Sequence, residues 1–250
     1  MNLSLFNYNL PEELIAQYPP ANRGSSRMLI YDKKADRVTH SYFNSIVDMF
    51  NPGDVFVIND TKVIPAKLRG VKDSGAKVEV LLIEELAYNQ WKCLVKPGSK
   101  VKQGAKLIFN KDIVGEVLDI FFDGARLIEF SVDNLLKVLE EIGEMPLPPY
   151  IISEHGKKED NARYQTIFAK KSGAIAAPTA GLHFNEDILN KLKAKGIEIV
   201  SVTLHVGLGT FKPVEVENIE DHNMHSEKYE IPKESADNIN NAKKRGNQDY

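Results

Sequence analysis

The chain has 250 residues, of which 42% are hydrophobic and 27% are charged, as is ordinary for a soluble globular protein with one large domain or two smaller ones. Its formal net charge of −3 excludes a protein that is basic throughout, although a local basic surface is compatible with it. The single cysteine, Cys93, excludes an internal disulfide, favours a reducing compartment and lies among apolar residues typical of a core.

The first 67 residues mix helical and strand patterns. We predict a short helix after Asn9, a hairpin from the segments MLIYD and VTHSYF, a helix near residues 45–50 and an apolar strand at 55–59. The opening sequence MNLSLFNYNLPEEL lacks the basic and apolar regions of a signal peptide, and no segment approaches the roughly 20 apolar residues that span a bilayer. We therefore expect a cytoplasmic protein with no membrane partner.

The pattern changes in residues 68–145. Short β segments alternate with glycine, aspartate and asparagine turns, which is typical of a small barrel or sandwich. A helix follows, with Asp133 as its N-cap and Gly143 at its end. We predict an inserted β-barrel-like domain at 68–145, between a first part (1–67) and a second part (146–250) of one α/β domain. The predicted fold class is therefore α/β, with mixed helices and strands.

Basic side chains are concentrated in and beside this β segment, and residues 86–111 contain no acidic residue. A cationic face would attract the phosphate backbone of RNA, and the binding would weaken steeply with salt. A solvent-exposed face that only keeps the protein soluble is the alternative. The candidate RNA-binding residues are Lys67, Arg69, Lys92, Lys96, Lys100 and Lys102.

The second part begins after a stiff, proline-rich run at 145–150. Residues 174–177 predict a short buried strand, Asn185 caps a helix that stops at Gly196, and alternating apolar residues predict a strand at 197–206. Such a β-α-β crossover places both strands parallel in one sheet. We predict a further strand at 226–231 and a helix at 233–245.

Two histidines follow these two strands. His183 comes after the first and His205 lies near the end of the second, so both are expected at the carboxyl edge of the sheet, where open α/β sheets bind ligands. Imidazole titrates near neutral pH, and a positioned general acid or base contributes about 10²–10⁴ in rate. The alternatives are that His183 is a turn residue that hydrogen-bonds the backbone, and that His205 only fills the polar face of its strand. Together the two imidazoles favour a catalytic site.

The segment from Asp221 to Glu227 is a second polar cluster, with His222 and His225 three residues apart. These histidines can share a helical face and, together with His183 and His205, form a metal site. No familiar zinc spacing is present, so a solvated polar loop is the competing interpretation. A metal-dependent hydrolase built on the four histidines remains an alternative function.

Three other segments offer groups for a ligand. The turn that contains Gly207, Gly209 and Thr210 has backbone N–H groups open to close approach, but it is not the dinucleotide fingerprint because no helix follows. The sequence Asn59-Asp60-Thr61 follows a buried strand and can present a carboxylate, or else form a turn or cap. Arg163 can hold an anion, although a surface ion pair is the default.

Long motifs run through the whole chain: LPEELIAQYP, SRMLIYD, PGDVFVINDTKVIPA, KVEVLL, IGEMPLPPYI, RYQTIFA, AAPTAGLHF, VTLHVGLGTFKPV and EDHNMHSE. With these motifs the chain resembles the S-adenosylmethionine:tRNA ribosyltransferase-isomerases of queuosine biosynthesis. The resemblance extends to about Gly246 and implies an α/β domain with an inserted β-barrel.

The resemblance also implies an activity. Such an enzyme transfers and isomerises the ribosyl moiety of S-adenosylmethionine onto 7-aminomethyl-7-deazaguanine at the wobble position of tRNA, giving epoxyqueuosine, adenine and methionine. S-adenosylmethionine is the ribosyl-donating co-substrate, and the reaction needs no metal. The expected catalytic residues are His183, His205, Asp221, His225 and Glu227. The expected substrate-binding residues are Asn59, Asp60, Thr61, Arg163, Tyr164, Gln165, Thr166, Pro178, Thr179, Gly181, Phe184, Gly207, Gly209 and Thr210.

The resemblance predicts a further glycine-rich strand and helices where this chain has only residues 247–250. We therefore expect the second part of the α/β domain to end prematurely, with an unpaired strand edge that lowers solubility or causes self-association. An inactive, truncated RNA-binding remnant is the remaining alternative function. For a folded chain we expect a monomer whose partner is the precursor tRNA.

Overall fold

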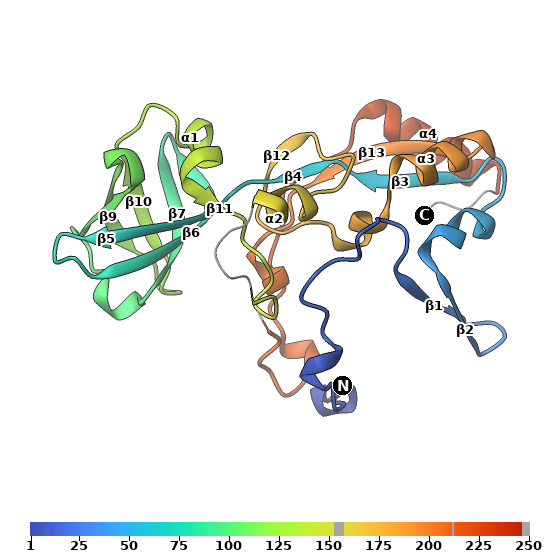
Figure 1. The fold of residues 1–250 in the computed structure, drawn as a ribbon, viewed down its shortest axis with the longest axis horizontal. Helices are drawn as coiled ribbons and strands as arrows, with labels where there is room; N and C mark the ends of the chain where they lie inside the picture. Colours follow the sequence, from blue (N-terminus) through green and yellow to red (C-terminus); the bar gives the residue numbers. More distant parts are fainter. Residues whose placement is uncertain (153–157, 212, 247–250) are drawn as a thin grey trace.

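A computed structural model describes residues 1–152, 158–211 and 213–246. A β-barrel lies beside a part with mixed helices and strands, to which both ends of the chain contribute (Figure 1). The predicted fold class is confirmed, whereas the expectation about residues 247–250 lies outside the described residues. The domain boundaries at 67/68 and 145/146 stay a prediction.

The barrel is closed by six antiparallel strands in the order β5-β6-β7-β10-β9-β8, with β8 pairing back onto β5. Buried residues alternate with half-buried ones along the first half of β6, so the period-2 pattern of the sequence sends one set of side chains inward. The short strand β11 (Gly143–Glu144) adds to β5 from outside the closed ring. The barrel strands are β5 (Lys67–Lys72), β6 (Lys77–Ala87), β7 (Gln90–Lys96), β8 (Lys106–Phe109), β9 (Val114–Ile120) and β10 (Arg126–Phe130).

The barrel has its own hydrophobic core. Leu82, Leu107 and Ile128 are fully buried inside it, and α1 (Leu135–Ile142) packs its apolar face onto the same cluster. Cys93 belongs to this core, as predicted, and burial raises the pKa of its thiol well above the ordinary value. The cap of α1 is Asn134 rather than the predicted Asp133, because the Asn134 side chain accepts a hydrogen bond from the Lys137 N–H. Two short 3₁₀ helices, η4 (Gly98–Lys100) and η5 (Asn110–Asp112), complete the barrel.

The other part is built on one long segment that changes partners at Asp60. Before this residue β3 (Val55–Asn59) pairs in parallel with β13 (Glu198–Leu204), and after it β4 (Thr61–Val63) pairs in parallel with β12 (Lys171–Ala174). The Asp60 N–H donates to the Val202 carbonyl at 2.9 Å, while the Asp60 carbonyl accepts from the backbone N–H groups of Lys170 and Lys171 at 2.7 and 3.1 Å. A short strand, β14 (Tyr229–Glu230), pairs antiparallel with β13.

This topology corrects the predicted β-α-β unit. The first strand is β12, three residues earlier than predicted, and residues 175–177 are buried without being a strand. Their apolar character reflects burial: the N–H groups of Ile175 and Ala176 both donate to the Val206 carbonyl instead of forming a regular ladder. β12 and β13 therefore pair with successive parts of one segment, in two small sheets rather than one.

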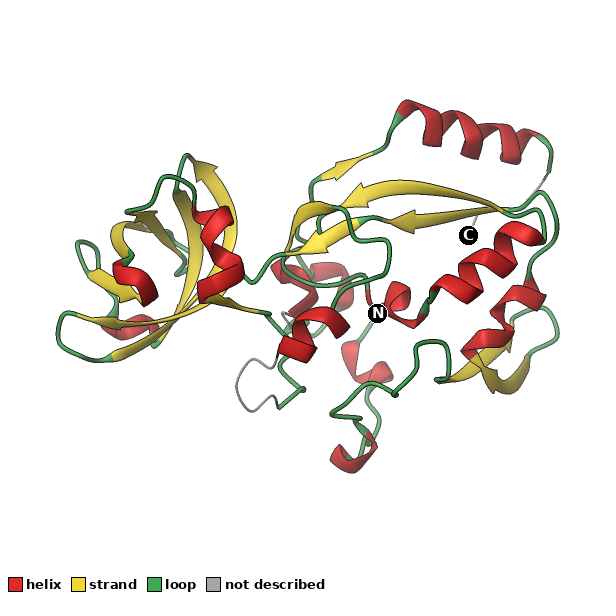
Figure 2. Cartoon of the chain, turned by 45° about the horizontal axis from the view of Figure 1, so that its top comes forward, coloured by secondary structure: helices red, strands yellow, loops and turns green. Residues whose placement is uncertain are grey.

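Two helices lie on opposite faces of the β3–β13 pair (Figure 2). Helix α3 (Glu186–Ala194) is capped by Asn185 as predicted, and its buried residues pack with Phe50 and Phe184. Helix α4 (Lys233–Lys244) covers the other face, where Ala242 packs with Val55 and Val200. Helix α2 (Lys158–Arg163) precedes β12. Among the described residues, no helix is long and apolar enough to cross a membrane.

The N-terminal region is mostly short elements. The predicted hairpin is confirmed as β1 (Arg27–Asp32) and β2 (Arg37–Tyr42). The predicted short helices are single turns or runs of 3₁₀ geometry rather than α-helices, and the extreme N-terminus contacts a distant segment through a Leu3 N–H to Glu217 carbonyl bond of 2.8 Å. The remaining 3₁₀ helices are η1 (Leu3–Phe6), η2 (Glu12–Leu14), η3 (Phe43–Met49), η6 (Thr179–His183), η7 (Leu208–Phe211) and η8 (Ile219–Asp221).

Candidate functional site

A cleft of about 1160 Å³ lies between the barrel and the β12–β13 side of the molecule. One wall comes from β6 and β7 and includes Trp91 and Lys92; an ion pair of 2.7 Å between Lys228 Nζ and Glu84 Oε1 joins this wall to the opposite one. The opposite wall carries several residues that the sequence singled out. These are His205, Gly207, Gly209, His225 and Glu227.

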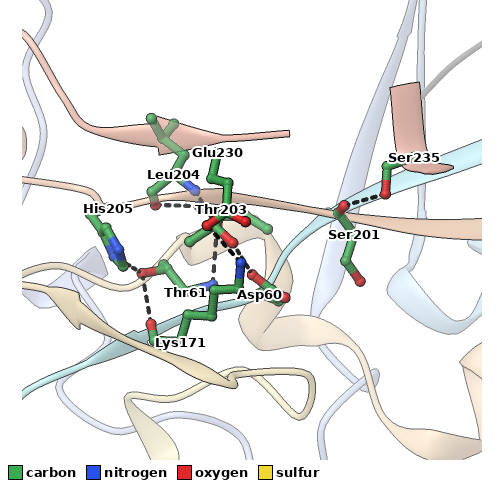
Figure 3. Close-up of polar contacts among 10 residues, drawn as sticks. Asp60, Thr61, Lys171, Ser201, Thr203, Leu204, His205, Glu230 and Ser235 are labelled. Carbon is green, nitrogen blue, oxygen red and sulfur yellow. Dashed lines mark hydrogen bonds and ion pairs between the residues drawn. The ribbon is translucent and has the colours of Figure 1, made fainter. Parts of the chain in front are cut away.

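His205 is the first residue after β13, and its ring is held by two neighbours. Its Nδ1 atom lies 2.8 Å from the Thr61 hydroxyl oxygen (Figure 3). One side of the ring lies against Gly173, whose φ of +150° is a conformation that side-chain-bearing residues rarely adopt. A Cβ atom at Gly173 would be only 2.8 Å from His205 Cε1, so glycine there makes room for the imidazole.

The surroundings of His205 favour its neutral form. Partial burial lowers its pKa below the ordinary value of 6.5, and the positive charges of Lys171 and Lys228 lower it further. The negative charges of Asp60 and Glu230 act in the opposite direction without reversing the shift. At neutral pH the imidazole therefore has a free lone pair and can accept a proton from a ligand in the cleft.

The predicted substrate residues Asn59, Asp60 and Thr61 instead tie the strands together beneath His205. The Asn59 side chain bonds both backbone groups of Leu204, donating to its carbonyl at 2.9 Å and accepting from its N–H at 3.0 Å. The Asp60 carboxylate accepts a hydrogen bond of 2.6 Å from the Thr203 hydroxyl. These side chains hydrogen-bond to the neighbouring strand, and the bonds fix the position of His205, the residue after Leu204.

The glycine turn after His205 lines the cleft, but one of its N–H groups is already occupied. Gly207 N–H donates to Glu227 Oε1 at 2.8 Å, so this group is not open to a ligand in the way the sequence suggested. Gly209 packs against His225, since a Cβ at this glycine would lie 3.0 Å from His225 Cδ2. Thr210 N–H points back to the Gly207 carbonyl at 3.4 Å. Segments 205–210 and 225–227 thus form one wall together.

His183 has different surroundings from His205. It ends η6, and its ring packs against Phe43 with a centroid separation of 5.0 Å. Neither His183 nor Asp221 is among the described residues that line the cleft. Asp221 is exposed at the end of η8. The structure therefore does not bring the two imidazoles together at the cleft, and only His205 faces it.

The remaining predicted substrate residues hold chain segments in place. Arg163 donates to the carbonyls of Pro20 and Ala21 at 2.6 and 3.1 Å. Gln165 bonds the N–H and the carbonyl of Val63 at 3.0 and 2.6 Å. The others belong to buried clusters or to η6 and its ends, and do not line the cleft. They are Tyr164, Thr166, Pro178, Thr179, Gly181 and Phe184.

The second histidine cluster does not form the predicted helical face. His222 follows η8 with extended backbone angles, and the residues up to Lys228 form no helix or strand. Since 3₁₀ geometry ends at Asp221, the three-residue spacing does not align His222 with His225. Within the described ranges, no group of three or more His, Cys, Asp or Glu side chains is arranged to hold a metal ion.

The predicted basic face is narrower than the sequence suggested. Lys67 pairs with Glu79 at 3.1 Å, Arg69 with Glu144 at 2.8 Å, and Lys92 with Asp123 at 2.7 Å. Acidic residues outside the lysine-rich segment thus neutralise half of the candidates, which a linear count of charges does not reveal. The exposed candidates for which the described part of the chain shows no ion pair are Lys96, Lys100 and Lys102.

Trp91 and Gly173 are among the cleft residues that sequence reasoning missed. Trp91 is buried in the barrel core and lines the cleft, and its Nε1 has no hydrogen-bond partner among the described residues. Gly173 precedes the apolar run at 174–177, and only its backbone conformation reveals its role against His205. The only signal for Trp91 was that it is the single tryptophan of the chain. Nothing in the sequence marked Gly173.

Comparison with known protein families shows to which family the chain belongs. The family described as "Queuosine biosynthesis protein" matches residues 3–249. This chain belongs to that family. The resemblance inferred from the motifs is thereby confirmed, and neither alternative function is favoured.

Individual members of the family are closely similar. The S-adenosylmethionine:tRNA ribosyltransferase-isomerases of Clostridioides difficile (strain 630) and Thermosipho melanesiensis are both 49% identical to this chain, over 244 and 246 residues. The alignments cover 96% and 98% of this chain and 71% and 72% of those relatives. The crystal structure of an S-adenosylmethionine tRNA ribosyltransferase from Thermotoga maritima is 33% identical, with a TM-score of 0.42; 98% of this chain and 67% of that chain are covered.

Proposed function

We propose that this chain is an S-adenosylmethionine:tRNA ribosyltransferase-isomerase, which transfers and isomerises the ribosyl moiety of S-adenosylmethionine onto 7-aminomethyl-7-deazaguanine at the tRNA wobble position. The products are epoxyqueuosine-tRNA, adenine and methionine. The names of relatives that are 49% identical support this activity. One observation assigns this activity to a site: His205, whose lowered pKa favours the neutral imidazole, lies on the wall of the large cleft.

The cleft suits the co-substrate chemically. S-adenosylmethionine supplies a sulfonium, which acidifies the adjacent ribose carbon so that a base can start the loss of adenine. The carboxylates of Glu84, Glu85 and Glu227 line the cleft and favour a cation there, and Trp91 and Phe211 offer aromatic surface. Lys67 and Lys92 line the same cleft but are paired with Glu79 and Asp123, so a methionine carboxylate would have to compete with these acidic side chains.

The size of the cleft fits a second substrate. Pockets for single small molecules usually measure about 300–1,000 Å³, and this cleft is larger. Enzymes that act on a nucleobase extrude it from the stack into their site. We assign the additional space to the modified base, and the exposed Lys96, Lys100 and Lys102 of the barrel to the tRNA backbone.

Within this proposal His205 is the general base, because it is neutral and faces the cleft. Glu227 orders the glycine turn that borders the co-substrate, and His225 packs beside it. His183 and Asp221 keep a catalytic role only if substrate binding brings them toward the cleft. The co-substrate is S-adenosylmethionine without a metal, and we propose a cytoplasmic monomer that acts on precursor tRNA.

Adenine release tests the proposal directly. The full chain is incubated with S-adenosylmethionine and tRNA carrying 7-aminomethyl-7-deazaguanine, and free adenine is measured. We expect release that a chelator does not affect, and a fall of about 10²–10⁴-fold in His205→Ala. His40→Ala, in the exposed hairpin, is the matched control. Absence of adenine release from the folded wild-type chain would refute the proposal, and undiminished release by His183→Ala would remove that residue from the mechanism.

A further inference from the structure

The buried Thr61 hydroxyl has two neighbours, and only one arrangement of hydrogens satisfies both. Its oxygen lies 2.8 Å from His205 Nδ1 and 3.5 Å from the Lys171 carbonyl oxygen (Figure 3). Thr61 is completely buried, so its hydrogen has no water to bond and needs an acceptor within the protein.

A carbonyl oxygen can only accept, so a bond with Lys171 requires the Thr61 hydroxyl to donate to it. The Thr61 oxygen is then free to accept from a proton on His205 Nδ1. This arrangement makes one hydrogen bond of 2.8 Å and one long hydrogen bond of 3.5 Å, whereas a hydroxyl that donates to Nδ1 makes only the first. Because the Thr61 hydroxyl is buried, the arrangement that uses both its hydrogen and its oxygen in hydrogen bonds is favoured.

We infer that Thr61 is a positioning residue, which fixes His205 as the Nδ1-protonated tautomer and leaves Nε2 as the proton-accepting atom of the cleft. This inference rests on the proposed function for its meaning, since a general base needs a lone pair directed at the substrate. It assigns Thr61 a place behind the imidazole instead of the contact with substrate that the sequence suggested.

The ring cannot easily leave this position. Gly173 lies against it, and a side chain there would be 2.8–3.1 Å from three ring atoms. Leu204, the residue before His205, is held by the Asn59 side chain through both its backbone N–H and its carbonyl. With the ring held in this way, the tautomer decides which nitrogen carries the lone pair.

Charged groups face His205 from each neighbouring element. Asp60 lies at the β3–β4 junction, Lys171 in β12, and Lys228 and Glu230 before and within β14. Lys171 and Glu230 form an ion pair of 2.7 Å, so part of their effect on the ring cancels. No carboxylate is hydrogen-bonded to Nδ1 among the described residues. Thr61 therefore takes the orienting place that an acidic side chain often occupies.

Nitrogen-15 NMR of the histidine-labelled 250-residue chain tests the tautomer without any substrate. His205 is assigned from the signal that is lost in His205→Gln, and the spectrum is recorded at a pH where the ring is neutral. We expect protonated Nδ1 and unprotonated Nε2 in the wild type. A wild-type ring protonated on Nε2 would overturn the inference, even if no variant of Thr61 folds.

Two substitutions then separate positioning from structure. Thr61→Val keeps the shape without the hydroxyl, and should shift the ring toward the Nε2-protonated form that imidazole favours in water. We expect kcat for adenine release to fall by about 10–100-fold with KM unchanged, less than the loss in His205→Ala. Thr61→Ser should restore both the tautomer and most of kcat.

An unchanged tautomer and kcat in a folded Thr61→Val would also overturn the inference. Failure of the proposed function is recognised separately, because the NMR result holds whether or not the wild-type protein releases adenine.

Discussion

The Thr203 hydroxyl donates a hydrogen bond of 2.6 Å to the Asp60 carboxylate, and both side chains are buried. Asp60 is also the residue whose backbone connects to β13 on one side and β12 on the other. The bond therefore joins the end of β13 to the point where the central segment changes partners. The position of His205, two residues after Thr203, depends on this junction.

Removing this hydroxyl should destabilise the protein. Thr203→Val leaves the buried Asp60 carboxylate without this bond, and we expect the free energy of unfolding to fall by about 1–3 kcal/mol. Urea denaturation followed by circular dichroism measures the change. Thr203→Ser keeps the hydroxyl and loses only the methyl group, so it should be destabilised clearly less; a Thr203→Val variant as stable as the wild type would contradict the prediction.

The stability of the protein should depend on pH through His205. Its folded-state pKa is lowered from 6.5, so below about pH 6.5 the unfolded chain binds a proton that the folded chain resists. The contribution to stability is complete above that pH and is lost as the pH falls toward the folded-state pKa. Urea midpoints across this range should fall less steeply for His205→Gln. Parallel curves for the two proteins would contradict the lowered pKa.

The bond from Gly207 N–H to Glu227 should matter for the reaction. Glu227→Ala removes the acceptor, and we expect kcat/KM for adenine release to fall by about tenfold, which corresponds to about 1.4 kcal/mol and to one hydrogen bond with a charged group. Glu227→Gln keeps an acceptor oxygen and should fall less. If the glutamine variant falls as far as the alanine variant, the negative charge matters more than the bond.

The exposed lysines of the barrel should govern tRNA affinity. The triple variant Lys96→Gln, Lys100→Gln, Lys102→Gln should bind tRNA more weakly, and the slope of log K against log salt should decrease by about 1 for each of these lysines that neutralises a phosphate. Filter binding at several salt concentrations measures both quantities. Lys33→Gln, on the exposed tip of the β1–β2 hairpin, is the control. Indistinguishable salt slopes would exclude this face from the tRNA interface.

Local patterns predicted the elements well because their signals are local. The alternation in β6, the Asn185 cap and the β1–β2 hairpin each depend on neighbouring residues and are confirmed. Pairing between strands was less predictable. The run at 174–177 showed burial but not hydrogen bonding, and the change of partner at Asp60 depends on contacts with residues more than 100 positions away.

The site was predictable only in part, for the same reason. The glycine turn and His205 were identified because an unusual motif follows a strand at a sheet edge. His183 was expected beside His205 on the assumption of a single sheet, whereas it packs on Phe43. The acidic partner of Lys67 comes from β6 and that of Lys92 from the turn between β9 and β10, so the sequence could not show that these charges are neutralised.

Strand β4 ends at Val63 and the barrel strand β5 begins at Lys67, so the chain that carries Thr61 runs straight on into the barrel (Figure 1). Only residues 64–66 separate the two strands, so one continuous segment both positions the hydroxyl behind the imidazole and begins the barrel wall.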